Sequence, residues 1–350
     1  MAKDDITIKT ENGELVTANA PIIVSASRST DIPAFYADWF MHRLKVGYSI
    51  WTNPFNGVPS YVSYQNTKFI VFWSKNPRPL IEHLDTLKDM GIECYIQYTL
   101  NDYDDEQLEK GVPKVAHRIE TFKKLVDKLG KGRVIWRFDP LILTDVISID
   151  LLLQKIDKIG DQLQGYTEKL VFSFADIEGY VKVKKNLNTN GIKYRNFTEQ
   201  EMLEFGQRLA KLNEKWGYVL ATCGEKVDLN QFGIEHNHCV DDRLIVRFGY
   251  KSQSLLAYLG AEIWQPQIFE PTPPEDAILL DNGDYAVISA NNAAKGQRTF
   301  CGCMKSKDIG QYNTCPHMCE YCYANTSKEA ALSNYQRHKL NPNAETIIGK

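Results

Sequence analysis

The sequence contains no apolar run that approaches the ~20 residues needed for a membrane-spanning helix. Its N-terminal residues 1–5 are polar and lack the apolar stretch of a signal peptide, so we expect a cytoplasmic protein with no membrane contact. Internal repeats and low-complexity tracts are also absent. The formal net charge is −3, which argues against general binding of polyanions.

The cysteines are clustered, and their clustering indicates metal binding. The 350 residues include 8 cysteines, and several of them fall close together near the C-terminal end. Disulfides are rare in the cytoplasm, where clustered cysteines more often bind metal. Apolar residues make up 43% of the chain and charged residues 24%, as in ordinary globular proteins. At ~150 residues per domain, the length fits one large domain with an appendage.

From Pro21 onward, short apolar segments alternate with amphipathic segments, several of which end at glycine. Because apolar strands are typical of parallel sheets buried on both faces, the alternation predicts an α/β fold. The first strand–helix turn lacks G-x-G-x-x-G, which weighs against a dinucleotide-binding sheet. The expected strands are 22–25, 48–52, 69–73, 94–99, 133–138, 170–174 and 218–222, and the expected helices are 34–45, 79–90, 113–129, 149–163 and 199–216.

Polar residues at the strand ends favour a parallel β/α barrel, complete or partial and TIM-like, with a C-terminal cysteine-rich arm that binds a cluster. Barrel enzymes build their sites from strand ends and the loops that follow them. Two plainer interpretations stay open: a solvated Lys75, and a simple ion pair between Arg137 and Asp139. The candidates for positioning a substrate or cofactor are Arg28, Lys75, Arg137, Asp139 and Asp176.

The composition changes along the chain divide it into segments. Asn12-Gly13 predicts a turn between two short strands, and a Pro-rich stretch follows the barrel pattern. The last residues are polar and expected to be mobile. We expect an N-terminal hairpin over 1–20, the barrel over 21–248, a Pro-rich insertion with a small hairpin over 249–294, a cluster-binding segment over 295–328 and a polar tail over 329–350.

Cys315, Cys319 and Cys322, the first cysteine group, have C-x3-C-x2-C spacing. Such short spacings wrap a loop around one metal centre, and thiolates are the ligands of iron–sulfur clusters and of zinc. Three thiolates without a fourth favour a [4Fe–4S] cluster with one open iron. His317 inside the loop keeps a zinc site open as an alternative, and a fourth cysteine such as Cys303 would instead give an electron-carrying cluster.

Cys223, Cys239, Cys301 and Cys303 form the second cysteine group. Four thiolates could complete a second iron–sulfur cluster or a structural zinc site that pins the C-terminal arm to the barrel. Equally, Cys223 and Cys239 could be packed thiols while Cys301 or Cys303 joins the first group. Cys94 is expected to be a core thiol.

Three further features are assigned from the residues alone. Asp31 precedes Ile32-Pro33 and is expected to cap a helix. The basic stretch 182–195 could contact nucleic acid in a zinc-stapled binding module, although an exposed loop is the commoner meaning of such a run. His236 and His238, beside Cys239, are candidate ligands.

The first group, with Tyr321 before its last cysteine, resembles the cluster motif of radical S-adenosylmethionine enzymes, especially the spore photoproduct lyase branch. The resemblance implies a [4Fe–4S] cluster that binds and cleaves S-adenosylmethionine, an unknown substrate at the barrel mouth, and a reductant such as ferredoxin or flavodoxin. Tyr321 and Glu225 would be cofactor-binding residues. The chain departs from that pattern in two ways: the motif normally follows the first barrel strand, and Cys223-Gly224-Glu225 only loosely matches the Gly-Gly-Glu stretch.

More broadly, the chain is similar to a bacterial family of unknown function that pairs an α/β domain with a C-terminal cysteine cluster. The similarity covers about 21–248 and 295–325 and implies no known reaction. It rests on the stretches 25–33, 72–77, 136–140, 222–225, 233–236, 239–242 and 301–325.

Overall fold

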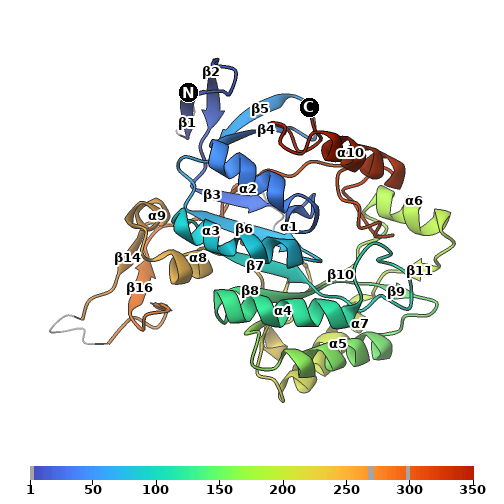
Figure 1. Cartoon of the computed structure of the whole chain (residues 1–350). Coiled ribbons are helices and arrows are strands. Elements are labelled where there is room, and N and C mark those ends of the chain that lie inside the picture. The colour runs from blue at the N-terminus through green and yellow to red at the C-terminus, as the bar shows by residue number, and fades with distance from the viewer. Residues whose placement is uncertain (1–3, 267–271, 297–299) are drawn as a thin grey trace.

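The computed structural model describes residues 4–266, 272–296 and 300–350. Its centre is an eight-stranded sheet in which all neighbouring strands are parallel (Figure 1). The expectation of an α/β fold with a large parallel sheet is therefore confirmed. In spatial order the strands are β17 (Lys307–Asp308), β3 (Ile23–Ala26), β6 (Phe69–Ser74), β7 (Glu93–Thr99), β8 (Val134–Leu141), β10 (Lys169–Phe174), β12 (Val219–Thr222) and β13 (Ile234–His236).

Both faces of the sheet are buried, because successive strand residues point to opposite faces and nearly all of them are apolar. Val24, Ile70 and Ile96 belong to one large core, and their neighbours Ile23 and Val71 belong to another. The helices over the first core are α1 (Ile32–Phe35), α2 (Ala37–Val46), α3 (Leu84–Asp89), α4 (Val115–Leu129), α5 (Ile149–Leu163) and α7 (Glu199–Asn213). The second core contains α8 (Asp242–Gly249) and α9 (Gln253–Leu259).

The two edge strands of the sheet are β13 and β17. The backbone N–H of Met304, just before β17, donates to the carbonyl of Val240, just after β13, at 2.9 Å. Neither strand was expected from the sequence, because segments of three and two residues are too short to show a periodic pattern.

Segment 48–52 forms a strand, but its expected place in the parallel sheet is wrong. As β4 (Tyr48–Thr52) it pairs antiparallel with β5 (Pro59–Ser63) in a separate sheet. Three of its five residues are partly exposed, so β4 lacks the continuous burial of a central parallel strand. The N-terminal hairpin of β1 (Asp5–Lys9) and β2 (Leu15–Asn19) completes this four-stranded sheet.

The stretch 182–195 is more ordered than the expected loop. It contains most of α6 (Val181–Thr189) and the strand β11 (Tyr194–Arg195), which pairs with β9 (Leu143–Thr144). Val183 and Leu187, four positions apart on one helix face, are buried and hold α6 to the core.

Residues 249–294 contain α9 and a small three-stranded sheet. Its strands are β14 (Ala261–Ile263), β15 (Ile278–Leu279) and β16 (Tyr285–Ile288), and β15 and β16 form a hairpin around Gly283. The middle of the Pro-rich stretch lies outside the described residues. The 3-10 helices η1 (Arg78–His83) and η2 (Asn230–Phe232) complete the described elements.

The segment 329–350, expected to be a polar tail with mobile last residues, is instead folded. It contains most of α10 (Lys328–Leu340), which lies beside α2 (Figure 1). The indole N–H of Trp39 donates to the carbonyl of Ala344 at 2.8 Å, and Ile347 is buried. The apolar residues that hold this segment to the rest of the protein are isolated from one another in the sequence. They therefore do not form the amphipathic pattern that would have predicted a packed helix. In the described ranges, no helix has the length and apolar character to cross a membrane.

Candidate metal centres at the carboxyl end of the sheet

The loop between β17 and α10 carries the first cysteine group along the carboxyl ends of β3 and β6. The hydroxyl of Tyr36 donates to the carbonyl of Thr314 at 2.6 Å, and Thr30 Oγ1 donates to the carbonyl of Gln311 at 2.8 Å. The backbone N–H of Gly111, in the loop after β7, donates to the carbonyl of His317 at 2.8 Å. The cysteine loop is therefore fixed to the segment after β3 and to the loop after β7.

Asp31 is the polar centre of this attachment. Its carboxylate caps α1 through the N–H of Ala34 at 3.0 Å, as the sequence predicted. It also accepts from Ser74 Oγ at 2.6 Å, from the N–H of Lys75 at 2.7 Å and from Nε2 of His317 at 2.7 Å. Asp31 therefore joins β3, β6 and the cysteine loop.

His317 is held through both ring nitrogens. Nε2 contacts the carboxylate of Asp31, and Nδ1 lies 3.2 Å from the carbonyl of Gly111. Both partners are hydrogen-bond acceptors, so both ring nitrogens are engaged by groups of the protein itself. The interpretation of His317 as a zinc ligand loses its support.

In the first group Cys319 is buried, and Cys315 and Cys322 are partly buried at the end of the sheet. Burial raises the pKa of Cys315 to about 12, although the N–H groups of His317 and Asp31 donate to its sulfur. Burial likewise raises the pKa of Cys319, opposed by the nearby charge of Lys75. A metal would have to displace these protons on binding. Met318 adopts a positive φ of 57°, a strained conformation that turns the chain between Cys315 and Cys319.

Tyr321 sits in a buried network next to the first group. Its hydroxyl contacts Glu109 Oε1, Lys75 Nζ at 2.8 Å and Asn101 Nδ2 at 3.1 Å. Lys75 Nζ also pairs with Glu109 Oε1 at 2.7 Å. Burial would raise the pKa of Glu109, but Lys75 and Arg118 lower it to about 2. The interpretation of Lys75 as a solvated lysine is wrong, because its side chain is only 17% exposed and ion-paired.

The second cysteine group gathers on the neighbouring strand ends. Cys223 follows β12, Cys239 follows β13, and Cys303 lies shortly before β17. The sulfurs of Cys223 and Cys239 are 3.3 Å apart, and the N–H of Cys239 donates to the sulfur of Cys303 at 3.2 Å. The side chains of Cys301 and Cys303 also interact. None of the chain's cysteines, all of which the structure describes, forms a disulfide.

These contacts distribute the protons of the second group unevenly. Hydrogen bonds from Cys223 and Cys303, aided by Arg137, hold the pKa of Cys239 well below its usual range despite burial. The same bonds raise the pKa of Cys223 and Cys303, while the contact with Cys303 lowers the pKa of Cys301 to about 6.

Arg137 and Asp139 lie beside the second group. Arg137 Nη1 donates to the sulfur of Cys239 at 3.3 Å and to Gln97 Oε1 at 3.0 Å. Its Nη2 pairs with Asp139 Oδ2 at 2.5 Å, and Ser173 Oγ donates to the other carboxylate oxygen. The ion pair left open by the sequence is thus present, and it also contacts a cysteine sulfur.

Arg28 lies between the two cysteine groups. Its carbonyl accepts a hydrogen bond at 2.9 Å from the hydroxyl of Tyr323, the residue that follows Cys322. Its guanidinium stacks over Trp73 at 5.2 Å and interacts electrostatically with Cys303 and Cys239. Arg28 is also exposed, so it offers a positive charge to solvent at the carboxyl end of the sheet.

Other predicted site residues have contacts elsewhere. Asp176 is exposed and accepts from the N–H of Gly179 at 3.0 Å, which is a turn contact. Glu225 Oε1 accepts from the N–H of Phe174 at 2.8 Å. Cys94 is a buried core residue, as expected.

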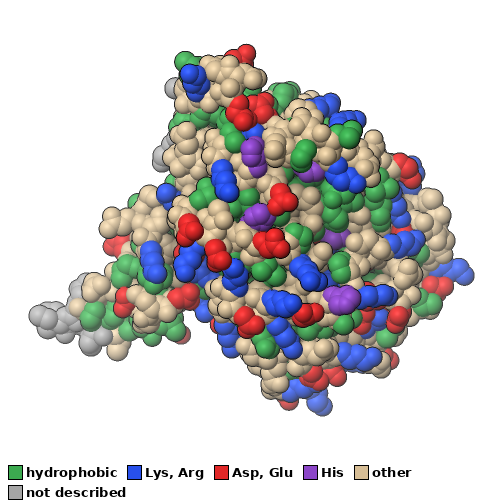
Figure 2. Space-filling model, in the orientation of Figure 1, with side chains coloured by type: hydrophobic (Ala, Val, Ile, Leu, Met, Phe, Trp, Pro, Cys, Tyr) green, Lys and Arg blue, Asp and Glu red, His purple; other side chains and the backbone are tan. Residues whose placement is uncertain are grey.

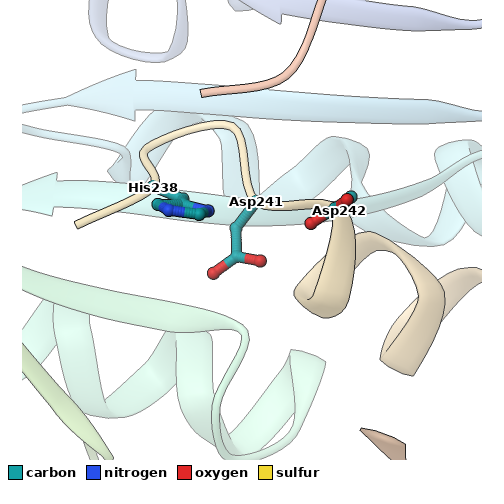
Figure 3. A group of neighbouring side chains, drawn as sticks. All are labelled: His238, Asp241 and Asp242. Carbon is teal, nitrogen blue, oxygen red and sulfur yellow. The ribbon is translucent and has the colours of Figure 1, made fainter. Parts of the chain in front are cut away.

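His238 belongs to a different cluster. Figure 3 shows it with Asp241 and Asp242, and the ligand atoms of the three lie within 4.8 Å of one another. Asp241 already caps α8 through the N–H of Arg243 at 2.9 Å, and Asp242 accepts from Asn292 at 3.0 Å. Helix capping and side-chain packing account for these carboxylates.

The charges of the basic stretch 182–195 are largely engaged within the protein. Lys184 pairs with Glu178 at 2.5 Å, Arg195 pairs with Glu201 at 2.7 Å, and Lys182 lies over the ring of Tyr312. On the face seen in Figure 2, acidic and basic side chains are interspersed. Both observations weaken the interpretation of a nucleic-acid surface.

Two residues of the network were missed in the sequence. Asn101 lies just beyond β7, so the rule that selected Lys75 and Asp139 at strand ends would also have selected it. Glu109 lies in an irregular loop and gives no comparable signal. A cavity of about 580 Å³ lined by Arg243, Arg247 and Glu168 is separate from these residues.

The fold and site define an α/β protein whose parallel sheet carries two groups of cysteines at its carboxyl end. The family model described as "Domain of unknown function (DUF1848)" matches residues 23–324, and the chain belongs to this family. The expected membership of a family of unknown function is thereby confirmed.

The other comparisons add little. No curated protein sequence matches the chain significantly. A solved structure described as "a putative alpha-L-fucosidase from Bacteroides thetaiotaomicron" is 12% identical, with a TM-score of 0.26. The match covers 65% of this chain and 76% of that chain. At this TM-score the likeness supports no argument about structure or activity.

Proposed function

We propose that the protein is a radical S-adenosylmethionine-type iron–sulfur enzyme whose first cysteine group holds a [4Fe–4S] cluster. The observation that carries the proposal is the position of the unit formed by β17, the cysteine loop and α10. β17 lies beside β3 at the edge of the sheet, so the loop emerges at the carboxyl ends of the parallel strands. In barrel enzymes this end is where reactions take place.

This position supports the proposal despite the unusual location of the motif in the sequence. In the enzymes that the motif resembles, the cysteine loop follows the first strand. Here it follows the last strand in the chain, but that strand is first in space, and β3, β6, β7, β8, β10, β12 and β13 follow in order. This is the strand order that a circularly permuted barrel would have. We propose that the sheet closes into a barrel near the hydrogen bond between Met304 and Val240.

The residues present fit a cluster with three protein ligands. Both nitrogens of His317 are engaged, and Cys303 lies with Cys239 in the second group, so neither supplies a fourth ligand to the first. Backbone N–H groups donate to the sulfur of Cys315, and such bonds tune the potential of iron–sulfur clusters. A bound cluster of this kind would supply the electron that cleaves S-adenosylmethionine and begins radical chemistry.

The chain's own residues would position the reactants. Lys75 and Glu109 fix Tyr321 beside Cys322, which keeps the cluster loop rigid. Arg28 is exposed, so its guanidinium is available to orient a polar substrate or the cofactor, while Asp139, which is 22% exposed, would hold Arg137 in position beside them. A cytoplasmic location and a reductant such as ferredoxin or flavodoxin follow from the need to keep thiolates and cluster reduced.

Anaerobic purification and reconstitution tests the proposal. We expect about four irons and four sulfides per chain at the first group, lost in Cys319→Ala and retained in Cys94→Ala, whose thiol lies in the core. Reduced protein should change its EPR spectrum when S-adenosylmethionine is added. A cluster that ignores S-adenosylmethionine would support an electron carrier instead, and zinc without iron in the first group would overturn both.

A further inference from the structure

Cysteines from separate parts of the chain meet where the two edge strands of the sheet approach one another. Cys223 comes from the end of β12 and Cys239 from the end of β13, while Cys301 and Cys303 belong to the segment before β17. The carbonyl of Cys303 accepts from the N–H of Ala294 at 3.0 Å, which fixes the position of this segment. The second cysteine group therefore spans the junction between the two edges of the sheet.

The contacts among these thiols form a continuous series. Cys223 contacts Cys239 at 3.3 Å between sulfurs, Cys239 interacts with Cys303, and Cys303 interacts with Cys301. A cysteine in a protein core packs as a small apolar residue and does not require contact with another thiol. Cys94, which lies among apolar side chains, is an example. Convergence of four thiols is what an all-cysteine metal site requires.

Donors already surround the sulfurs of the group. Arg137 Nη1 and Asn237 Nδ2 each lie 3.3 Å from the sulfur of Cys239, and the N–H of Cys239 donates to Cys303. Arg137 and Asn237 are themselves buried, so both are held in place. Metal-bound thiolates characteristically accept hydrogen bonds from a surrounding layer of this kind, which orients the ligands and offsets their negative charge.

We infer that the second cysteine group binds a second metal centre with all-thiolate ligation, either zinc or an iron–sulfur cluster. The centre fastens the segment before β17 to the ends of β12 and β13. It is separate from the proposed cluster of the first group, because each of the four thiols has partners within the second group.

The decisive protein is a variant in which Cys315, Cys319 and Cys322 are all alanine. Purified without oxygen from cells supplied with zinc and iron, it should retain metal: about one zinc ion per chain, or iron with sulfide if the centre is a cluster. Adding Cys239→Ala should remove that metal, and adding Cys94→Ala should leave it. A triple variant free of metal, or metal that survives Cys239→Ala, would overturn the inference.

A second measurement uses the unaltered chain, so its result does not depend on whether a cysteine variant folds. Thiol alkylation followed by peptide mapping should find Cys223, Cys239, Cys301 and Cys303 protected together, and a strong chelator should expose them together. Protection unchanged by complete metal removal would contradict a metal centre. Failure of the proposed enzyme function is distinguishable, because the first group would then lack a cluster while these four thiols stayed metal-protected.

Discussion

The carboxylate of Asp31 and the imidazole of His317 form a buried contact, with 2.7 Å between Oδ2 and Nε2, although 286 residues separate them in the sequence. Their side chains are 5% and 3% exposed. Asp31 also contacts the backbone of Lys75, so one carboxylate joins the segment after β3, the end of the neighbouring strand β6 and the cysteine loop. The geometry of the first cysteine group thus depends on contacts made far away in sequence.

A double-mutant cycle on this pair should show strong coupling. Asp31→Asn and His317→Gln each deprive a buried polar side chain of its hydrogen-bond partner, and we expect each to destabilise the fold by about 1–3 kcal/mol. The double variant should cost about 2 kcal/mol less than the sum of the two. Urea unfolding of the four proteins measures this, and additive effects would show that the pair is not coupled.

Gly111→Ala should disturb the cysteine loop through sterics alone. A Cβ at this position would lie 2.6 Å from the carbonyl oxygen of His317, and backbone atoms there cannot move aside easily. We expect a loss of about 1–3 kcal/mol in unfolding free energy and reduced metal in the first group. Gly206→Ala is the control, since its Cβ would meet side-chain atoms and no backbone, with Leu229 at 3.1 Å and Phe232 at 3.4 Å. Equal effects of both substitutions would count against a docking role for Gly111.

Lys75→Met should be far more damaging than loss of a surface lysine. It would leave the carboxylate of Glu109 buried, with only Arg118 at 3.6 Å as a countercharge. Breaking a buried pair in this way costs about 3 kcal/mol. Lys124→Met, which removes an exposed pair with Glu120, should change the urea midpoint little. Similar midpoints for the two variants would mean that the network around Tyr321 contributes little.

Acidification should weaken the attachment of α10. Burial against Tyr36 and Tyr335 lowers the pKa of His338, partly offset by a hydrogen bond with the backbone of Ile347. Protonation is therefore easier in the unfolded chain, so stability is complete above a pH of ~6.5 and is lost as pH falls below it. Urea midpoints between neutral and acid pH should decrease, and His338→Gln should flatten the decrease.

The sequence predicted most of the central strands because they are long, apolar and bounded by turn signals. β7 and β8 illustrate this, since nearly all their residues are buried. β13 and β17 were not predicted because strands of three and two residues are too short to show a periodic pattern. β4 was assigned to the wrong sheet because a short apolar run does not indicate which strand it pairs with.

The sequence identified the cysteines of both groups, but not the residues that hold them. Spacing within 315–322 indicated one centre directly, whereas the meeting of Cys223, Cys239 and Cys303 depends on how strands are ordered in space. Asp31 was identified only as a helix cap, because its contact with His317 has no local signature. Long-range polar contacts of this kind cannot be read from neighbouring residues.

The pairing of β17 with β3 also has a consequence for synthesis. The free edge of β3 is covered only after the ribosome has made β17. Ser306, just before β17, contacts Ser25 on β3 and lies 281 residues after it in the sequence. At ~5–20 residues per second, the ribosome leaves that edge open for roughly 15 to 55 s. During this interval the nascent chain presents an unpaired hydrogen-bonding edge, a site for association with other chains. Both the covering of this edge and the completion of the two cysteine groups therefore require the C-terminal part of the chain and come late in synthesis.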